Sequence, residues 1–252
     1  MLTSAEIKSI ALGFGADQCG IASADRFDSA PKGFHPRDVY SKGKSVVAFL
    51  KQMPTDVINT ENPVVYTHTA HFLYDALDKI GLSLCFSLEK LGIHAIPVPT
   101  DIPYTFYDAE KMHGMGIISM RHAAYNAGLG ILGRNTLLIN RELGNMAYIG
   151  AILVNAPIEP DPMVDDFSCP PNCTLCIEAC PMQALDGVTK REGEAYEDFV
   201  NRSAANPLAS RVKCADLEDN IDLRRAGEVK PKTAKRLTRY MTAWRKLKGI
   251  TH

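Results

Sequence analysis

The sequence predicts a mixed α/β domain, followed by a small cysteine-rich segment and a basic tail. Helical and strand-like patterns alternate over the first 156 residues, which is typical of an α/β domain. Four of the seven cysteines lie between residues 169 and 180, and basic residues dominate from 224 to 248. We therefore expect an α/β domain over residues 1–158, a separate segment over 159–215 and a helical tail over 216–252.

The N-terminal half supplies the clearest element signals. Thr3-Ser4-Ala5-Glu6 has the spacing of a capping box and predicts the start of a helix. Strands are expected at Cys19–Ala22 and at Ser45–Leu50, the second because it is a compact apolar run. Residues 68–91 carry the longest helical pattern, and Gly92 ends it.

The following stretch completes the expected sheet. Ala95–Pro99 is predicted to be an edge strand, because its prolines cannot donate hydrogen bonds to a neighbouring strand. A short helix is expected over residues 119–127, and strands over Thr136–Ile139 and Met146–Val154. Three prolines in Ala156–Pro162 predict a linker without regular structure.

Composition restricts the function classes. The chain has 252 residues and a net charge of −1, so no global charge favours nucleic-acid or membrane binding. No apolar run approaches the roughly 18 residues of a membrane span. The N-terminus lacks the features of a secretory signal, so a cytoplasmic location is expected.

The cysteine run predicts a metal centre. From Cys173 onward its spacing is C-x2-C-x3-C-P, as in bacterial ferredoxins, and the upstream spacing is one residue longer. We expect one [4Fe–4S] cluster on Cys169, Cys173 and Cys176, completed by either Cys180 or Cys214. The alternatives are a tetrahedral zinc site and a redox-active dithiol. In the cluster interpretation, Thr174 could donate a hydrogen bond to the sulfur atoms. The two remaining cysteines, Cys19 and Cys85, are expected to pack in the core.

A glycine-rich segment precedes the cysteine run. It reads Ala127-Gly128-Leu129-Gly130-Ile131-Leu132-Gly133-Arg134-Asn135-Thr136. Taken alone, it predicts a turn between a helix and a strand. Followed by a strand, Glu159-Pro160-Asp161 and the cysteine run, it resembles the epoxyqueuosine reductase family. The resemblance extends over roughly residues 5–190 and includes Gly20–Ala22 and Gly43–Val47.

This resemblance implies a cofactor and a reaction type. Members of the family are related to reductive dehalogenases and have an α/β domain similar to nitroreductase-like and cobalamin-processing folds. A ferredoxin-like iron–sulfur segment passes electrons to cobalamin in these oxidoreductases. The resemblance further implies an electron donor of the ferredoxin or flavodoxin type and a small-molecule or tRNA substrate. The positions carried over as cofactor contacts are Gly128, Gly130, Gly133, Arg134, Asn135 and Thr136.

Two family features are missing from the chain. Residues 114–119 hold no carboxylate where the family places an acid, and a second cluster motif is absent. The chain thus resembles a shorter, one-cluster relative, and the alternative is an electron-transfer or binding module that docks a partner or a flavin. Several side chains nearby could carry a proton: Asp101, Tyr104, Tyr107, Asp108, His113, Arg121 and His122. Of these, His113 and Tyr104 are the chosen candidates for catalysis.

The basic tail carries apolar residues at spacings of three and four residues, which predicts an amphipathic helix between Arg224 and Lys248. Such a helix can pack on its own domain with a solvated basic face. Its basic face could instead hold a tRNA or dock an acidic electron donor.

Overall fold

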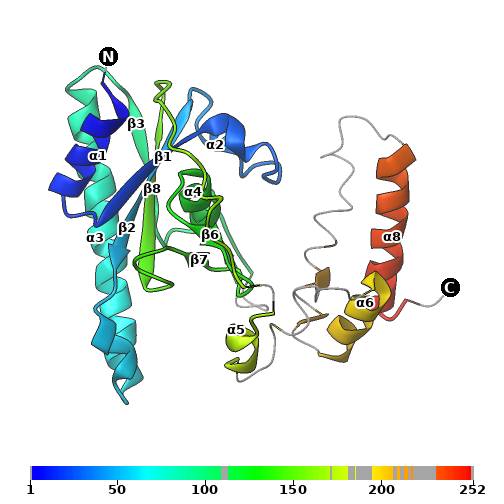
Figure 1. The fold of residues 1–252 in the computed structure, drawn as a ribbon. Coiled ribbons are helices and arrows are strands. Elements are labelled where there is room, and N and C mark those ends of the chain that lie inside the picture. Colours follow the sequence, from blue (N-terminus) through cyan, green and yellow to red (C-terminus); the bar gives the residue numbers. More distant parts are fainter. Residues whose placement is uncertain are drawn as a thin grey trace. The chain divides into compact units, whose positions relative to one another are not determined.

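The computed structural model describes residues 2–108, 113–170, 172–180, 185, 195–206, 209–210, 213–214, 217 and 231–250 (Figure 1). Internal contacts divide the chain into two units. The first comprises Met1–Gly133 and Leu137–Ser168, and the second comprises Arg134–Thr136 and Cys169–His252. The short segment Arg134–Thr136 therefore groups with the cysteine run and not with its immediate chain neighbours.

The first unit is built on a four-stranded sheet. Its order is β1 (Gln18–Ser23), β2 (Ser45–Gln52), β8 (Ala147–Val154) and β3 (Ala95–Val98), and each neighbouring pair is antiparallel. The first six residues of β2 are buried, as its apolar run predicts. β3 lies at an edge, which confirms the inference drawn from its prolines. The mixed α/β class is confirmed, with an antiparallel sheet.

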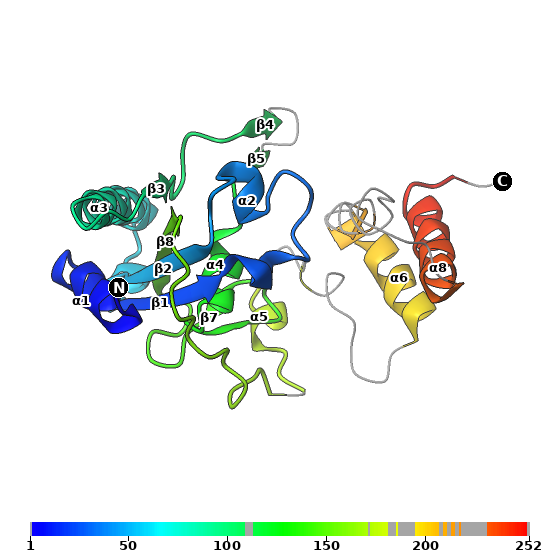
Figure 2. The same cartoon turned by 90° about the horizontal axis from the view of Figure 1, so that it is seen from above.

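Helices cover both faces of this sheet (Figure 2). α1 (Ser4–Gly13) and α3 (Pro63–Glu89) pack on one face in a core that includes Ile7, Phe49 and Leu84. α4 (Met120–Asn126) packs on the other face, where Ala123 meets Leu153 in a second core. The capping box at Thr3 is confirmed. α3 begins at Pro63, five residues before the predicted start, because the Asn62 side chain accepts from the amide of Val64.

Short elements connect these parts. A hairpin joins β4 (Phe106–Asp108) to β5 (His113–Met115), and a second pairing joins β6 (Ile131–Leu132) to β7 (Leu138–Ile139). The predicted strand Thr136–Ile139 was wrong at its start, because Thr136 has a left-handed backbone with φ of +64°. The connections also hold η1 (Ala24–Phe27), α2 (Pro36–Val39) and η2 (Thr55–Asn59).

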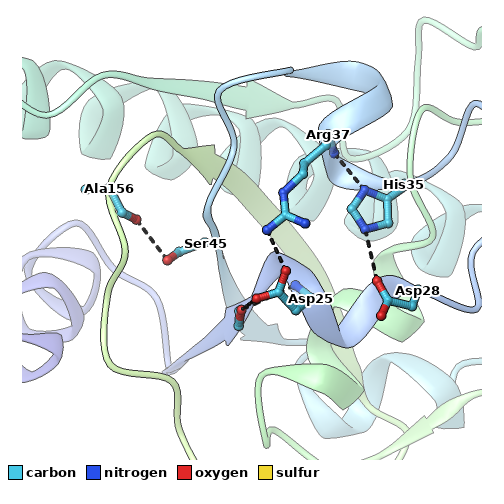
Figure 3. Close-up of polar contacts among 7 residues, drawn as sticks. Asp25, Asp28, His35, Arg37, Ser45 and Ala156 are labelled. Carbon is cyan, nitrogen blue, oxygen red and sulfur yellow. Dashed lines mark hydrogen bonds and ion pairs between the residues drawn. The ribbon is translucent and has the colours of Figure 1, made fainter.

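The predicted linker lacks regular structure, as expected, but it is fixed to the sheet. The Ser45 hydroxyl donates to the carbonyl of Ala156 and accepts from the amide of Ile158, both at 2.9 Å (Figure 3 shows the first bond). Asp161 accepts from the Lys8 ammonium group at 2.6 Å and from the amide of Ile21 at 2.9 Å. These bonds hold the linker against β1, β2 and α1.

The second unit contains α5 (Leu175–Glu178), α6 (Tyr196–Ala205) and α8 (Pro231–Leu247). The tail prediction of an amphipathic helix is confirmed, since Ala243 of α8 is buried against Val200 of α6 and Leu217. Its predicted N-terminal turns, residues 224–230, lie outside the described residues. None of the described helices combines the length and the apolar character that crossing a membrane requires.

Candidate functional site

The glycine segment begins where α4 ends. Gly128 has a φ of +72°, a left-handed conformation that glycine adopts readily, and the amide of Leu129 donates back to the carbonyl of Ala124. A Cβ atom on Gly128 would lie 2.2 Å from the carbonyl oxygen of Pro162. One on Gly130 would lie 2.3 Å from the carbonyl oxygen of Ile139. The backbone that approaches these two glycines is the chain's own.

A small hollow borders the same glycines. Gly128 and Gly130 line it together with polar side chains, among them Asn140 and Glu142, and its volume is about 210 Å³. Small-molecule sites usually measure about 300–1,000 Å³, and a corrinoid is larger than most of their ligands. This hollow alone is too small for a corrinoid.

Asn140 fixes the turn that closes the hollow. Its side chain is buried, and its amide nitrogen donates to the carbonyl of Leu129 at 2.6 Å and to Gln18 at 2.7 Å. Its amide oxygen accepts from the amides of Glu142 and Leu143, both at 2.9 Å. One side chain thus ties the glycine segment to β1 and to the turn before β8.

Arg134, which belongs to the second unit, contacts the cysteine run. The amide of Gly133 donates to the carbonyl of Leu137 at 2.9 Å, which closes a loop over the three residues between them. Within the second unit, the guanidinium of Arg134 donates to the backbone carbonyl of Cys173 at 2.9 Å. Within the second unit, Arg134, predicted as a cofactor contact, and Cys173, predicted as a metal ligand, therefore meet at this bond.

The four clustered cysteines are all half-buried, and none of the seven cysteines forms a disulfide. Cys176 lies in α5, while Cys214 is buried in the second unit. Among the described residues, no three His, Cys, Asp or Glu side chains converge closely enough to hold a metal ion. The predicted sulfur contact of Thr174 is not seen, because its hydroxyl donates to Glu178. Pro181 lies outside the described residues.

The two isolated cysteines behave as expected. Cys85 is buried in the core between α3 and the sheet, and Cys19 packs against that core. Burial raises the pKa of the Cys85 thiol to about 12, and it raises the pKa of the Cys19 thiol, near the Asp161 carboxylate, to about 12 as well. Both thiols therefore stay protonated at neutral pH.

The two candidate proton carriers, Tyr104 and His113, lie in different surroundings. The hydroxyl of Tyr104 donates to Asp101 at 2.8 Å, and this bond raises the pKa of Tyr104. Its ring stacks on Tyr107 with 5.8 Å between the ring centroids. The backbone of His113 pairs with Asp108 in the hairpin, and its side chain lies outside the described residues. The catalytic roles of Tyr104 and His113 remain predictions.

Similar proteins bear on these observations. No protein-family model matches the sequence. Epoxyqueuosine reductase from Staphylococcus aureus is 44% identical over 116 residues, which are 46% of this chain and 29% of that protein. The enzyme of that name from Leadbetterella byssophila is 27% identical over 208 residues, which are 72% of this chain and 64% of that protein. The sequence resemblance to epoxyqueuosine reductases is confirmed. The matched part spans less than two thirds of the length of each of these relatives.

Solved structures support the fold. The epoxyqueuosine reductase from Streptococcus thermophilus matches 98% of this chain and 80% of its own, with a TM-score of 0.52 and 17% identity. A reductive dehalogenase described as acting by B12-dependent dehalogenation matches 71% of this chain and 24% of its own, with a TM-score of 0.54 and 18% identity. At these identities the likeness shows a shared fold.

Proposed function

We propose that this chain is an iron–sulfur oxidoreductase similar to the epoxyqueuosine reductases. The observation that carries the proposal is the hydrogen bond from Arg134 to the carbonyl of Cys173. It joins Arg134, predicted to contact a redox cofactor, to Cys173, predicted to hold a cluster. Relatives named epoxyqueuosine reductase support the same reading.

In this proposal the cysteine run holds one [4Fe–4S] cluster. Cys169, Cys173 and Cys176 are three ligands, and Cys180 or Cys214 is the fourth. Four half-buried thiols within twelve residues, none of them in a disulfide, have the donor chemistry that such a cluster needs. The cluster would supply single electrons, and Arg134 would fix the loop that carries Cys173.

The proposed electron acceptor is cobalamin or a similar cofactor. Gly128 and Gly130 leave no room for the cofactor on the side where a side chain would extend. The carbonyl groups of Pro162 and Ile139 occupy that space. The contacts that we propose are therefore Gly133, Arg134, Asn135 and Thr136. The left-handed Thr136 is the strained residue of this loop, and such strain is often found at ligand sites.

The partners and substrate also belong to the proposal. A ferredoxin or flavodoxin would deliver electrons, and the substrate would be a tRNA or a small molecule. The exposed basic residues of α8, such as Lys235 and Arg236, are the proposed tRNA contacts, since the apolar face of that helix already packs on α6. The alternative, an electron-transfer module, is favoured by the absence of a carboxylate in residues 114–119.

Anaerobic purification followed by metal analysis tests the cluster. We expect about four iron atoms and four sulfides per chain, with loss of both in C173S and C176S. C180S and C214S are made separately, and the one that loses iron identifies the fourth ligand. C85S, in the other unit, is the matched control and should keep its iron. Zinc in place of iron would refute the proposal.

The role of Arg134 has its own test. We expect R134A to bind iron more weakly and to lose it faster to a chelator than the parent protein, because the loop of Cys173 loses its anchor. R134K should recover only part of the effect, since a lysine cannot reproduce the geometry of a guanidinium. Cobalamin titration, followed by its absorption spectrum, then separates the reductase from the electron-transfer module.

A further inference from the structure

The longest helix of the first unit has one face that the fold leaves exposed. α3 packs on the sheet and on α1 through buried residues such as Leu77, Leu84 and Leu88. Figure 2 looks almost along the axis of α3 and shows the sheet and α1 beside it. Because an α-helix has about 3.6 residues per turn, a line of exposed residues runs along α3 opposite the buried ones.

Six exposed residues form this line, which we call the α3 stripe. They are spaced alternately by four and by three residues: His68, Phe72, Asp75, Lys79, Leu82 and Phe86. This alternation is the repeat of a helix that pairs with another helix. Three of the six are large apolar side chains, which are 46% to 59% exposed. A face that only meets water has no need of these apolar side chains at the spacing of a helix pair.

The two charges in the middle of the stripe have no partner within the described chain. No described residue forms an ion pair or a side-chain hydrogen bond with Asp75 or with Lys79. Charged groups that enter a contact between helices are costly unless each meets an opposite charge. A partner for this stripe must therefore offer a cation to Asp75 and an anion to Lys79.

A second copy of α3 that runs in the opposite direction meets this requirement. With a two-fold axis midway between Asp75 and Lys79, Asp75 of each copy faces Lys79 of the other. A parallel pair would instead place Asp75 opposite Asp75 and Lys79 opposite Lys79, which is unfavourable. The charges of the stripe are thus self-complementary in the antiparallel orientation alone.

The same register brings the apolar side chains together on both sides of the charges. Phe72 of each copy faces Leu82 of the other, and Phe86 faces the ring of His68. The rings of His68 and Phe72 already meet edge to face, with 4.5 Å between their centroids. A contact about a two-fold axis requires one surface to complement itself, and the α3 stripe does so in both charge and apolar character.

We propose that the α3 stripe binds the α3 stripe of a second copy of this chain in antiparallel orientation. The surface lies wholly within α3, in the first unit. The proposal goes beyond the redox function proposed above and does not depend on it, because association is measured without an electron donor, a substrate or turnover.

Sedimentation equilibrium of the full-length protein, purified anaerobically and studied at about 1–100 µM, tests the surface. We expect a reversible equilibrium between one chain and two. D75K and K79D should each weaken the dimer at least about tenfold, because each places like charges opposite one another. The double variant D75K/K79D exchanges the two charges and should dimerise as the parent does. In a parallel pair, neither single variant would add a like-charge contact.

The matched control is K42D, which reverses an exposed lysine outside α3 and should leave the dimer unchanged. All the substituted positions are exposed, and far-ultraviolet circular dichroism verifies that each variant is folded. Three results would overturn the proposal. They are a single chain throughout the concentration range, single variants that dimerise as the parent does, and a double variant that stays monomeric.

Discussion

Residue 128 has no room for a side chain. Its backbone is left-handed, and a Cβ atom would lie 2.2 Å from the carbonyl oxygen of Pro162, which the fixed linker cannot withdraw easily. We expect Gly128→Ala to lower the free energy of unfolding by about 2–4 kcal/mol in urea titrations.

Gly13 provides the matched control for that substitution. It lies at the end of α1, with nothing within 4 Å of its Cβ position and no positive φ. Gly13→Ala should be neutral or stabilise the protein by up to about 1 kcal/mol. Equal effects of the two substitutions would show that the contact with Pro162 is not what requires glycine.

The two core thiols should be slow to alkylate. With pKa values of about 12, Cys19 and Cys85 have about one thiolate in ten thousand molecules at pH 8, against roughly one in four for an ordinary thiol. We expect iodoacetamide to spare both in the native protein, as mass spectrometry of peptides would record. Their rates should rise about tenfold per pH unit between pH 8 and 10, and fast labelling at pH 8 would contradict the assigned burial.

Single residues also show which features of the structure could be predicted from the sequence and which could not. The glycines at 128 and 130 predicted a turn, and a turn is present. The sequence does not reveal that the carbonyl groups of Pro162 and Ile139 occupy the space where side chains at these positions would lie. Asn126 carries no sequence signal at all, because only the fold reveals that this residue is buried and lines a cavity. Of the side chains that could carry a proton, the fold places Arg121 and His122 at this cavity.

At the scale of elements, Ser45 links the start of β2 to the segment after β8. Its hydroxyl is buried and makes two bonds to that segment, to Ala156 and Ile158. Ser45→Ala should therefore cost about 1–3 kcal/mol in urea unfolding, because the amide of Ile158 loses its acceptor. Ser9→Ala, on the exposed face of α1, should change stability by less than about 0.5 kcal/mol. A similar effect of both would rule out a structural role for the Ser45 hydroxyl.

Elements with strong local chemistry were predictable from the sequence. The capping box gave the start of α1, and the prolines of β3 gave its edge position. The paired strands β4 to β7 have only two or three residues each, too few for a periodic pattern. Their formation depends on the partner strand, which the local sequence does not specify.

At the scale of the whole molecule, the two units allow the proposed cluster to be probed separately from the sheet. Trp244, the only tryptophan, lies in α8 of the second unit, whereas the four-stranded sheet belongs to the first. If a cluster organises the second unit, removing iron should move the urea midpoint of Trp244 fluorescence to lower concentration. The sheet transition, followed by circular dichroism, should stay unchanged in the same titration. A fluorescence midpoint that is insensitive to iron would contradict this coupling.

The grouping of Arg134–Thr136 with the cysteine run could not be predicted from the sequence. Its bond joins residues 39 positions apart, and no periodicity or spacing relates them. The order of the two motifs was enough to indicate the related enzymes, but the contact depends on how the loop after Gly133 closes.

Pro97 has a consequence for how copies of the protein meet. β3 forms one margin of the sheet, and Pro97 is exposed there opposite Ile152 of β8. A proline tolerated in a paired strand turns its nitrogen toward solvent, so the outer rim lacks a donor at that point. A strand from another molecule would find an interrupted ladder, which protects this margin against the edge-to-edge growth that leads to aggregates.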